Sequence, residues 1–197
     1  MLLKRYDGYN LLNEASRKGE LSLVRYLVKQ GVSKSAKNAA LVVASENGHL
    51  EIVKYLIENG AGEKDEYEDD NEEDHIENAL ESAVNNGHLN IVKYMEEQGV
   101  DMHDEDHLLK IAGFNGHLEI VKYLVERGGN IHADNDQVLI WASEGGHFDI
   151  VKYLVQQGAD IHAQNDEALK RASSRGFSNI VNFLIEHGSD ENIFDGF

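Results

Sequence analysis

The 197-residue chain contains no cysteine and no proline, and aromatic residues make up only 8% of it. Without cysteine, disulfides, cysteine–zinc sites and thiol nucleophiles are excluded. A reducing, intracellular compartment is expected, because small extracellular domains usually depend on disulfides. Basic residues are also few, since 18 Lys and Arg stand against 36 Asp and Glu and give a formal charge of −18. That charge repels phosphates, so neither nucleic acid nor a membrane surface is an expected partner.

Long apolar runs are missing as well. The N-terminus becomes charged after two leucines and has no apolar stretch of the kind that a secretory signal needs. Nothing approaches the ~18 uninterrupted apolar residues that span a membrane. Hydrophobic residues nevertheless make up 41% of the chain, so a soluble protein with a packed core is expected.

The chain does contain a strong internal repeat. The segment Gly-His-Leu-Glu-Ile-Val-Lys-Tyr-Leu occurs intact from Gly48 and from Gly116, with four near copies elsewhere. The copies begin at Gly19, Gly48, Gly87, Gly116, Gly146 and Gly176, and a second glycine follows each by 12 residues, at Gly31, Gly60, Gly99, Gly128, Gly158 and Gly188. Because this inner spacing never varies, the pattern indicates six copies of one structural unit.

Each repeat predicts two helices. Between the glycines, apolar residues recur at i, i+3, i+4 and i+7, the spacing of one helix face, and the second glycine suits a left-handed C-terminal cap. A shorter helix precedes the first glycine, with leucine seven and alanine four residues before it in every copy. Two short helices cannot bury their apolar faces alone, so neighbouring pairs must stack. We predict one all-α domain, a solenoid of six helix-turn-helix repeats at about residues 7–31, 36–60, 76–99, 105–128, 135–158 and 165–188.

At these residues the chain resembles a known family. The segment Ala44–Ala61, Ala-Ser-Glu-Asn-Gly-His-Leu-Glu-Ile-Val-Lys-Tyr-Leu-Ile-Glu-Asn-Gly-Ala, is similar to an ankyrin repeat. The 29–30-residue period, with Gly158–Asp166, resembles the ankyrin arrays of giant amoeba-infecting viruses of the mimivirus kind. The resemblance covers about Leu11 to Gly188. It implies a protein-binding scaffold that contacts its partner with the concave side, formed by the first helices and the fingers between repeats. For a viral protein it implies the host cell cytoplasm.

The fingers are shorter than in the common ankyrin pattern. The usual repeat has 33 residues and a Thr-Pro-Leu-His tetrapeptide, which no copy contains, and three residues are missing between Ala133 and Leu139. We therefore predict shortened fingers without β-hairpins at residues 130–136 and 160–166. Asp136 or Asp166 is expected to cap the following helix in place of the threonine.

Histidine recurs at two positions of the repeat. Four follow the first glycine (His49, His88, His117 and His147), and three follow the second by four residues (His103, His132 and His162). Equivalent positions on successive repeats lie ~8–10 Å apart, whereas ligands held ~2.0–2.1 Å from one zinc lie within about 4 Å of each other. We therefore predict no metal site. Structural roles at the turns are predicted for Gly48 with His49, Gly87 with His88, Gly116 with His117, and Gly146 with His147.

The third repeat carries an acidic insertion, since 39 rather than 29 or 30 residues separate Gly48 from Gly87. Residues 63–74 hold nine carboxylates and one lysine. A calcium loop needs a mid-loop glycine that is missing here. A disordered acidic loop at residues 63–75 is therefore predicted, with a docking site for a basic partner as the alternative. Glu96 of the same repeat stands where the others have an aliphatic residue, so this repeat is expected to be the least stable.

Variable positions on the first helices are expected to determine the choice of partner. Five and two residues before the repeat glycine most copies are polar, but Ile111, Phe114 and Trp141 gather on successive first helices. Ile111 and Phe114 are three apart and share a helix face. With Glu144 and Asp106 as their rim, they predict a protein partner with an apolar plug and a basic rim. Packing within the array is the other interpretation of Trp141.

The repeats favour an interaction scaffold over an enzyme. A catalytic site needs several unlike groups that converge within about 3 Å, whereas a solenoid repeats the same residues at regular offsets. No catalytic residue, cofactor or metal is predicted, so a hydrolase is disfavoured. A structural or self-assembling array is the alternative. Ser178 replaces the apolar residue of the other copies, as in a capping repeat, and a monomer is therefore expected.

Overall fold

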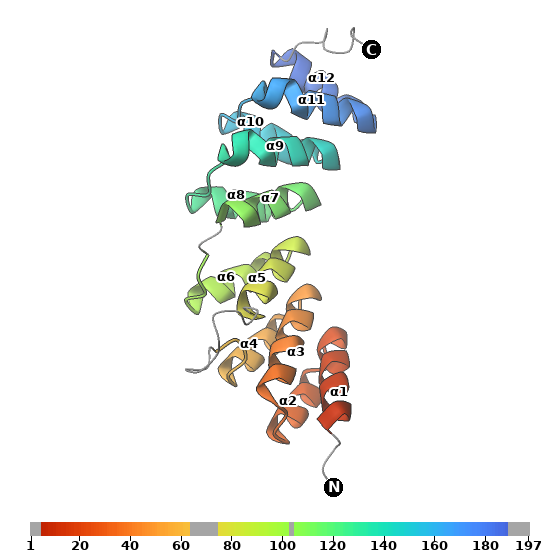
Figure 1. The fold of residues 1–197 in the computed structure, drawn as a ribbon, viewed down its shortest axis with the longest axis vertical. Coiled ribbons are helices and arrows are strands. Elements are labelled where there is room, and N and C mark those ends of the chain that lie inside the picture. The colour runs from red at the N-terminus through yellow and green to blue at the C-terminus, as the bar shows by residue number, and fades with distance from the viewer. Residues whose placement is uncertain (1–4, 64–74, 103–104, 189–197) are drawn as a thin grey trace. The chain divides into compact units, whose positions relative to one another are not determined.

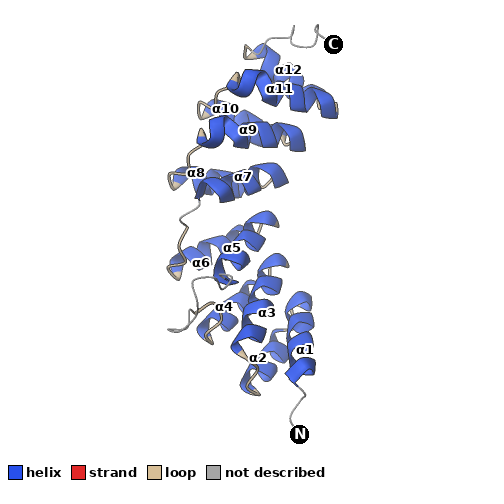
Figure 2. Cartoon of the chain, in the orientation of Figure 1, coloured by secondary structure: helices blue, strands red, loops and turns tan. Residues whose placement is uncertain are grey.

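The computed structural model describes residues 5–63, 75–102 and 105–188 (Figure 1). Within these residues every regular element is a helix and none is a strand (Figure 2). The helices belong to two compact units, Met1–Met102 and His103–Phe197. The predicted all-α fold of six helix pairs without β-hairpin fingers is therefore confirmed for the described residues. The prediction that all six repeats form one domain stays a prediction.

Each unit contains three helix pairs. The first unit holds α1 (Arg5–Lys18), α2 (Leu21–Lys29), α3 (Lys34–Glu46), α4 (Leu50–Glu58), α5 (His75–Asn85) and α6 (Leu89–Glu97). The second holds α7 (Glu105–Asn115), α8 (Leu118–Glu126), α9 (Ala133–Gly145), α10 (Phe148–Gln156), α11 (Ala163–Arg175) and α12 (Ser178–Glu186).

The first helices of each unit form its main packing layer. In the first unit α3 packs between α1 and α5, and in the second unit α9 packs between α7 and α11. The leucine and the alanine that recur before each repeat glycine are at most 3% exposed in all six repeats. A small side chain at the alanine position lets neighbouring helices approach closely, and a larger one would overpack the layer.

The repeat glycine ends each first helix in a left-handed conformation. Its φ lies between 75° at Gly48 and 83° at Gly116. The N–H of the next residue then donates to the carbonyl of the recurring alanine, as His147 does to Ala142 at 2.9 Å. This glycine-dependent cap satisfies a carbonyl at the helix end and turns the chain into the second helix.

The shortened fingers close through three consecutive left-handed residues. Asp134–Asp136 have φ of 52–58°, and Gln164–Asp166 have φ of 53–59°. Aspartate and asparagine tolerate this region better than most residues do, which suits five of these six positions. The expected helix caps do not form, because the carboxylates of Asp136 and Asp166 bond elsewhere. The carboxylate Oδ1 of Asp136 instead accepts from the Nδ1–H of His132, and that of Asp166 from His162, both at 2.9 Å.

The acidic insertion lies mostly at residues 64–74, outside the described residues, so its predicted loop stays a prediction. Glu96 of the same repeat is described. It lies half-buried on α6. The aliphatic residues at the equivalent position of the other repeats are half-buried as well: Val28, Ile57, Val125, Val155 and Ile185. Its Oε1 atom is shielded from solvent. The third repeat therefore places a carboxylate where the others bury part of an aliphatic side chain.

Glu96→Val is expected to raise the free energy of unfolding by ~1 kcal/mol, because it exchanges a partly desolvated carboxylate for apolar burial. Urea unfolding measures the change, and Glu97→Val at the exposed neighbouring position is the matched control. Amide exchange should also be faster in residues 88–98 than in residues 117–127. Equal protection of the two helices, or a loss of stability in Glu96→Val, would contradict the expectation.

Candidate partner-binding surface

Helices α7 and α9 bring apolar side chains together. Ile111 and Phe114 lie on α7 and Trp141 lies on α9. The rings of Phe114 and Trp141 meet edge to face, with centroids 6.0 Å apart and planes inclined by 72°, a favoured geometry for aromatic pairs. Phe114 is 47% exposed, and Ile111 and Trp141 are half-buried. Trp141 is therefore partly packed within the unit, and it contacts the Phe114 ring, which is exposed to solvent.

The close approach of α7 and α9 depends on Gly113. A Cβ atom at this position would lie 2.7 Å from Cγ2 of the buried Val138. The other repeats carry serine or valine at the position of Gly113. A larger side chain at position 113 would therefore have to displace Val138.

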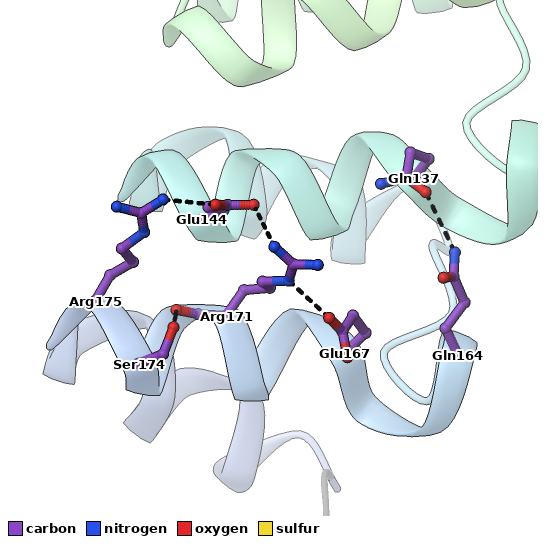
Figure 3. A network of polar contacts seen from close by, with 7 residues as sticks. All are labelled: Gln137, Glu144, Gln164, Glu167, Arg171, Ser174 and Arg175. Atoms are coloured by element: carbon purple, nitrogen blue, oxygen red, sulfur yellow. Dashed lines mark hydrogen bonds and ion pairs between the residues drawn. The ribbon is translucent and has the colours of Figure 1, made fainter.

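Glu144 lies on α9 between two arginines of α11 (Figure 3). Its Oε2 accepts from Nη1 of Arg171 at 3.1 Å, and its Oε1 accepts from Nη2 of Arg175 at 2.7 Å. Nε of Arg171 also donates to Oε1 of Glu167 at 2.6 Å. The Glu144 side chain is only 17% exposed. Glu144 is thus an internal ion-pair partner rather than an open carboxylate at the rim.

The ion pairs change the titration of Glu144. The hydrogen bond from Arg175 and the charges of both arginines lower the pKa of Glu144 below its usual value, although partial burial opposes the shift. A carboxyl whose pKa is lowered by folding contributes stability above the usual pKa and loses it as the pH falls through the lowered pKa. The network around Glu144 is therefore intact at neutral pH and weakens only in acid.

The other expected rim carboxylate, Asp106, is also engaged within the protein. Its Oδ1 accepts the backbone N–H of Asn130 at 2.9 Å. The expectation of a partner with a basic rim stays a prediction, although both named carboxylates form bonds within the protein.

The repeated histidines join successive repeats. The Nε2–H of His147 donates to the carbonyl of Phe114 at 2.7 Å, and His49 and His88 donate in the same way to Arg17 and Glu46, both at 3.0 Å. His117 occupies the same position before α8. Among the described residues no three His, Asp or Glu side chains lie together as metal ligands would. The bond from His147 ties the end of α7, and with it Phe114, to the next repeat.

A family model for ankyrin repeats, in three copies, matches residues 2–67, 64–135 and 108–195. The chain belongs to the ankyrin repeat family. The crystal structure of the human ASB11 ankyrin repeat domain is similar, with a TM-score of 0.71 and 25% identity over 91% of this chain and 84% of that one. No curated protein matches the chain. Ankyrin repeat domains generally mediate protein–protein interaction, and these matches do not show the resemblance to viral arrays in particular.

None of the described helices of this ankyrin chain is both long enough and apolar enough to cross a membrane.

The predicted set of surface residues omits Arg171 and Arg175, which this ankyrin chain places beside Glu144. Arg171 stands five residues before its repeat glycine, as Ile111 and Trp141 do. The sequence thus places Arg171 in the same row of variable positions, although it is not among the predicted contact residues. Its pairing with Glu144, 27 residues away in the chain, follows only from the stacking of α9 on α11.

Proposed function

We propose that this ankyrin repeat chain is a non-catalytic scaffold that binds a protein partner on the concave side formed by its first helices. The contact lies on the second unit, on a surface that we call the aromatic–arginine surface: Ile111, Phe114, Trp141, Glu144, Arg171 and Arg175. The exposed ring of Phe114 carries the proposal. Among the described residues only Tyr9, Leu11, Tyr26 and Phe114 are large hydrophobic side chains with high exposure. Phe114 alone of these lies on the second unit.

The packing around Phe114 suits an interface anchor. Binding hot spots are commonly aromatic side chains surrounded by residues that exclude water. Trp141 holds the Phe114 ring from one side, so little side-chain freedom remains to be lost on binding. Arg171 and Arg175, both ion-paired to Glu144, form a polar rim on the neighbouring repeat.

The setting of the scaffold is inferred from composition and period. The absence of cysteine in 197 residues supports an intracellular location. The 29–30-residue period resembles viral ankyrin arrays, so we place the protein in the host cytoplasm and its partner among host proteins. Ser178 on α12 is polar where every other repeat has leucine or phenylalanine, and Asn182 is uncharged where every other repeat has lysine or arginine. This supports a monomer over a self-assembling array, which sedimentation at increasing protein concentration would distinguish.

Phe114→Ala is expected to weaken partner binding by ~2 kcal/mol, about 30-fold in Kd. It should cost little stability, because the ring is 47% exposed. The partner is first captured from host-cell lysate on the immobilised chain and identified, and its purified form is then titrated calorimetrically into each variant. Tyr26→Ala, which removes a 56% exposed ring on the first unit, is the matched control.

Two results would count against the proposal. If Tyr26→Ala weakens binding and Phe114→Ala does not, the partner docks elsewhere. If Phe114→Ala unfolds the chain but the folded fraction binds normally, Phe114 is a packing residue.

A further inference from the structure

We infer that the aromatic–arginine surface selects an extended peptide segment with an apolar side chain and, three residues further along, a carboxylate. The inference rests on the proposed function and names the chemistry of the partner. The apolar side chain would contact Phe114 and Trp141. The carboxylate would contact Arg171 and Arg175.

Ion pairs hold the guanidinium groups of Arg171 and Arg175 in place, but only some of their nitrogen atoms donate in these pairs. Arg171 donates to Glu144 and Glu167 through Nη1 and Nε, and Arg175 donates to Glu144 through Nη2. Nη2 of Arg171, and Nε and Nη1 of Arg175, take no part in these ion pairs. The side chains are 47% and 58% exposed. A fixed guanidinium with N–H groups to spare recognises a planar carboxylate, often through two parallel hydrogen bonds.

The carboxylates of the same network do not offer a matching site for a basic partner. Both oxygens of Glu144 already accept from arginines, and Oε1 of Glu167 accepts from Arg171. A lysine or arginine of the partner would compete with Arg171 and Arg175 for Glu144, whose side chain is only 17% exposed. At this surface the groups that remain to be satisfied are therefore mainly donors, although the chain as a whole carries a charge of −18.

The spacing of the repeats sets the spacing in the peptide. Trp141 and Arg171 stand at the same repeat position on α9 and α11, and packed helices lie ~8–10 Å apart. A polyproline II segment rises ~3.1 Å per residue with three residues per turn, so three residues advance ~9 Å and return to the same side. A peptide can therefore contact the aromatic pair with an apolar residue and the arginine pair with an acidic residue three positions later.

The inference also predicts how binding depends on salt. The overall negative charge repels an acidic segment over long range, and salt screens charges beyond ~8–10 Å. The short contacts to the arginine pair are screened less, because they lie within that distance. Binding of the acidic segment should therefore change little, or strengthen, as salt rises. Binding of a basic segment would weaken as salt rises, because salt screens its attraction to the negatively charged chain.

The test uses fluorescence from Trp141, the single tryptophan of the chain. Two blocked nine-residue peptides of glycine and serine carry a leucine at the third position and either glutamate or lysine at the sixth. Each is titrated into the full chain at low and at high salt. The glutamate peptide is expected to bind at least tenfold more tightly, and Arg171→Gln should abolish that preference. Lys152→Gln is the matched control, because it removes the same charge from an exposed residue of α10.

Arg171→Lys is the second variant and guards against a folding defect. It keeps the positive charge but loses the planar fork, so most of the preference for glutamate should disappear while circular dichroism stays unchanged. Equal or tighter binding of the lysine peptide, or no response from Trp141 to either peptide at millimolar concentration, would overturn the inference. If the captured protein partner still depends on Phe114 in that case, only the peptide chemistry is wrong. If that dependence is also absent, the proposed function fails as well.

Discussion

Replacing Gly116 by alanine should destabilise the second unit by about 3 kcal/mol, the combined effect of a strained backbone and a displaced histidine ring. Gly116 has φ of 83°, a conformation that costs an L-residue ~1–2 kcal/mol. An alanine Cβ would also lie 2.6 Å from Cε1 and Nδ1 of His147. The ring would have to move, and its hydrogen bond to the carbonyl of Phe114 would be lost at ~0.5–1.5 kcal/mol.

Gly176 provides the matched control. It is the repeat glycine of the last helix pair and has nearly the same φ, 79°, but a Cβ there would meet nothing within 4 Å. Gly176→Ala should therefore cost only the backbone strain of ~1–2 kcal/mol. Urea unfolding followed by Trp141 fluorescence measures both variants. Equal losses would show that the contact between repeats adds nothing. If the contact matters, Gly116→Ala should lower the free energy of unfolding by less in a chain that already carries His147→Ala than in the unchanged chain.

Asp136→Ala should destabilise the second unit by about 2–3 kcal/mol, because it removes a buried charged acceptor that serves two donors. Asp136 is only 6% exposed. Its Oδ1 accepts the backbone N–H of Asp160, in the next finger, and the Nδ1–H of His132, both at 2.9 Å. Without the carboxylate the N–H of Asp160 loses its acceptor in a partly buried place.

Asp134→Ala is the control for the same left-handed turn. Asp134 shares the positive φ, but its carboxylate, which pairs with Lys110, is 65% exposed. Solvent therefore screens the carboxylate, and losing the pair is expected to cost ~1 kcal/mol or less. Asp136→Asn keeps an acceptor oxygen and should retain part of the stability. The comparison is made by urea unfolding at neutral pH. Similar losses in Asp134→Ala and Asp136→Ala would mean that backbone preference, and not the buried acceptor, explains the effect.

Much of the fold could be predicted because its causes lie within one repeat. The glycines at fixed spacing end helices, and leucine and alanine at fixed distances before them mark the buried face. These relations act within a few turns of one helix, where spacing alone determines which residues share a face. The missing residues of the finger likewise exclude a hairpin by length. Its left-handed turn at Asp134–Asp136 is not readable from length, since several turn conformations fit three residues.

The candidate surface was only partly predictable, because its contacts join residues of different repeats. The sequence alone places Ile111, Phe114 and Trp141 on successive first helices. It also places Glu144 at their rim. The stacking of α9 on α11 brings Arg171 and Arg175 onto Glu144 and changes it into a shared ion-pair partner.

Asp136 also shows the difference between what the sequence determines and what the tertiary structure decides. By itself the sequence determined the helix pairs, their ends and their buried faces, because local spacing and backbone preference control those features. Only the tertiary structure decided that Asp136 would accept a hydrogen bond from the next finger rather than cap a helix. It likewise decided that the surface beside Trp141 would present guanidinium donors rather than carboxylates. The physical reason is that the partner of a polar side chain depends on which groups a neighbouring repeat brings within about 3 Å, and that distance is set by the packing of helices.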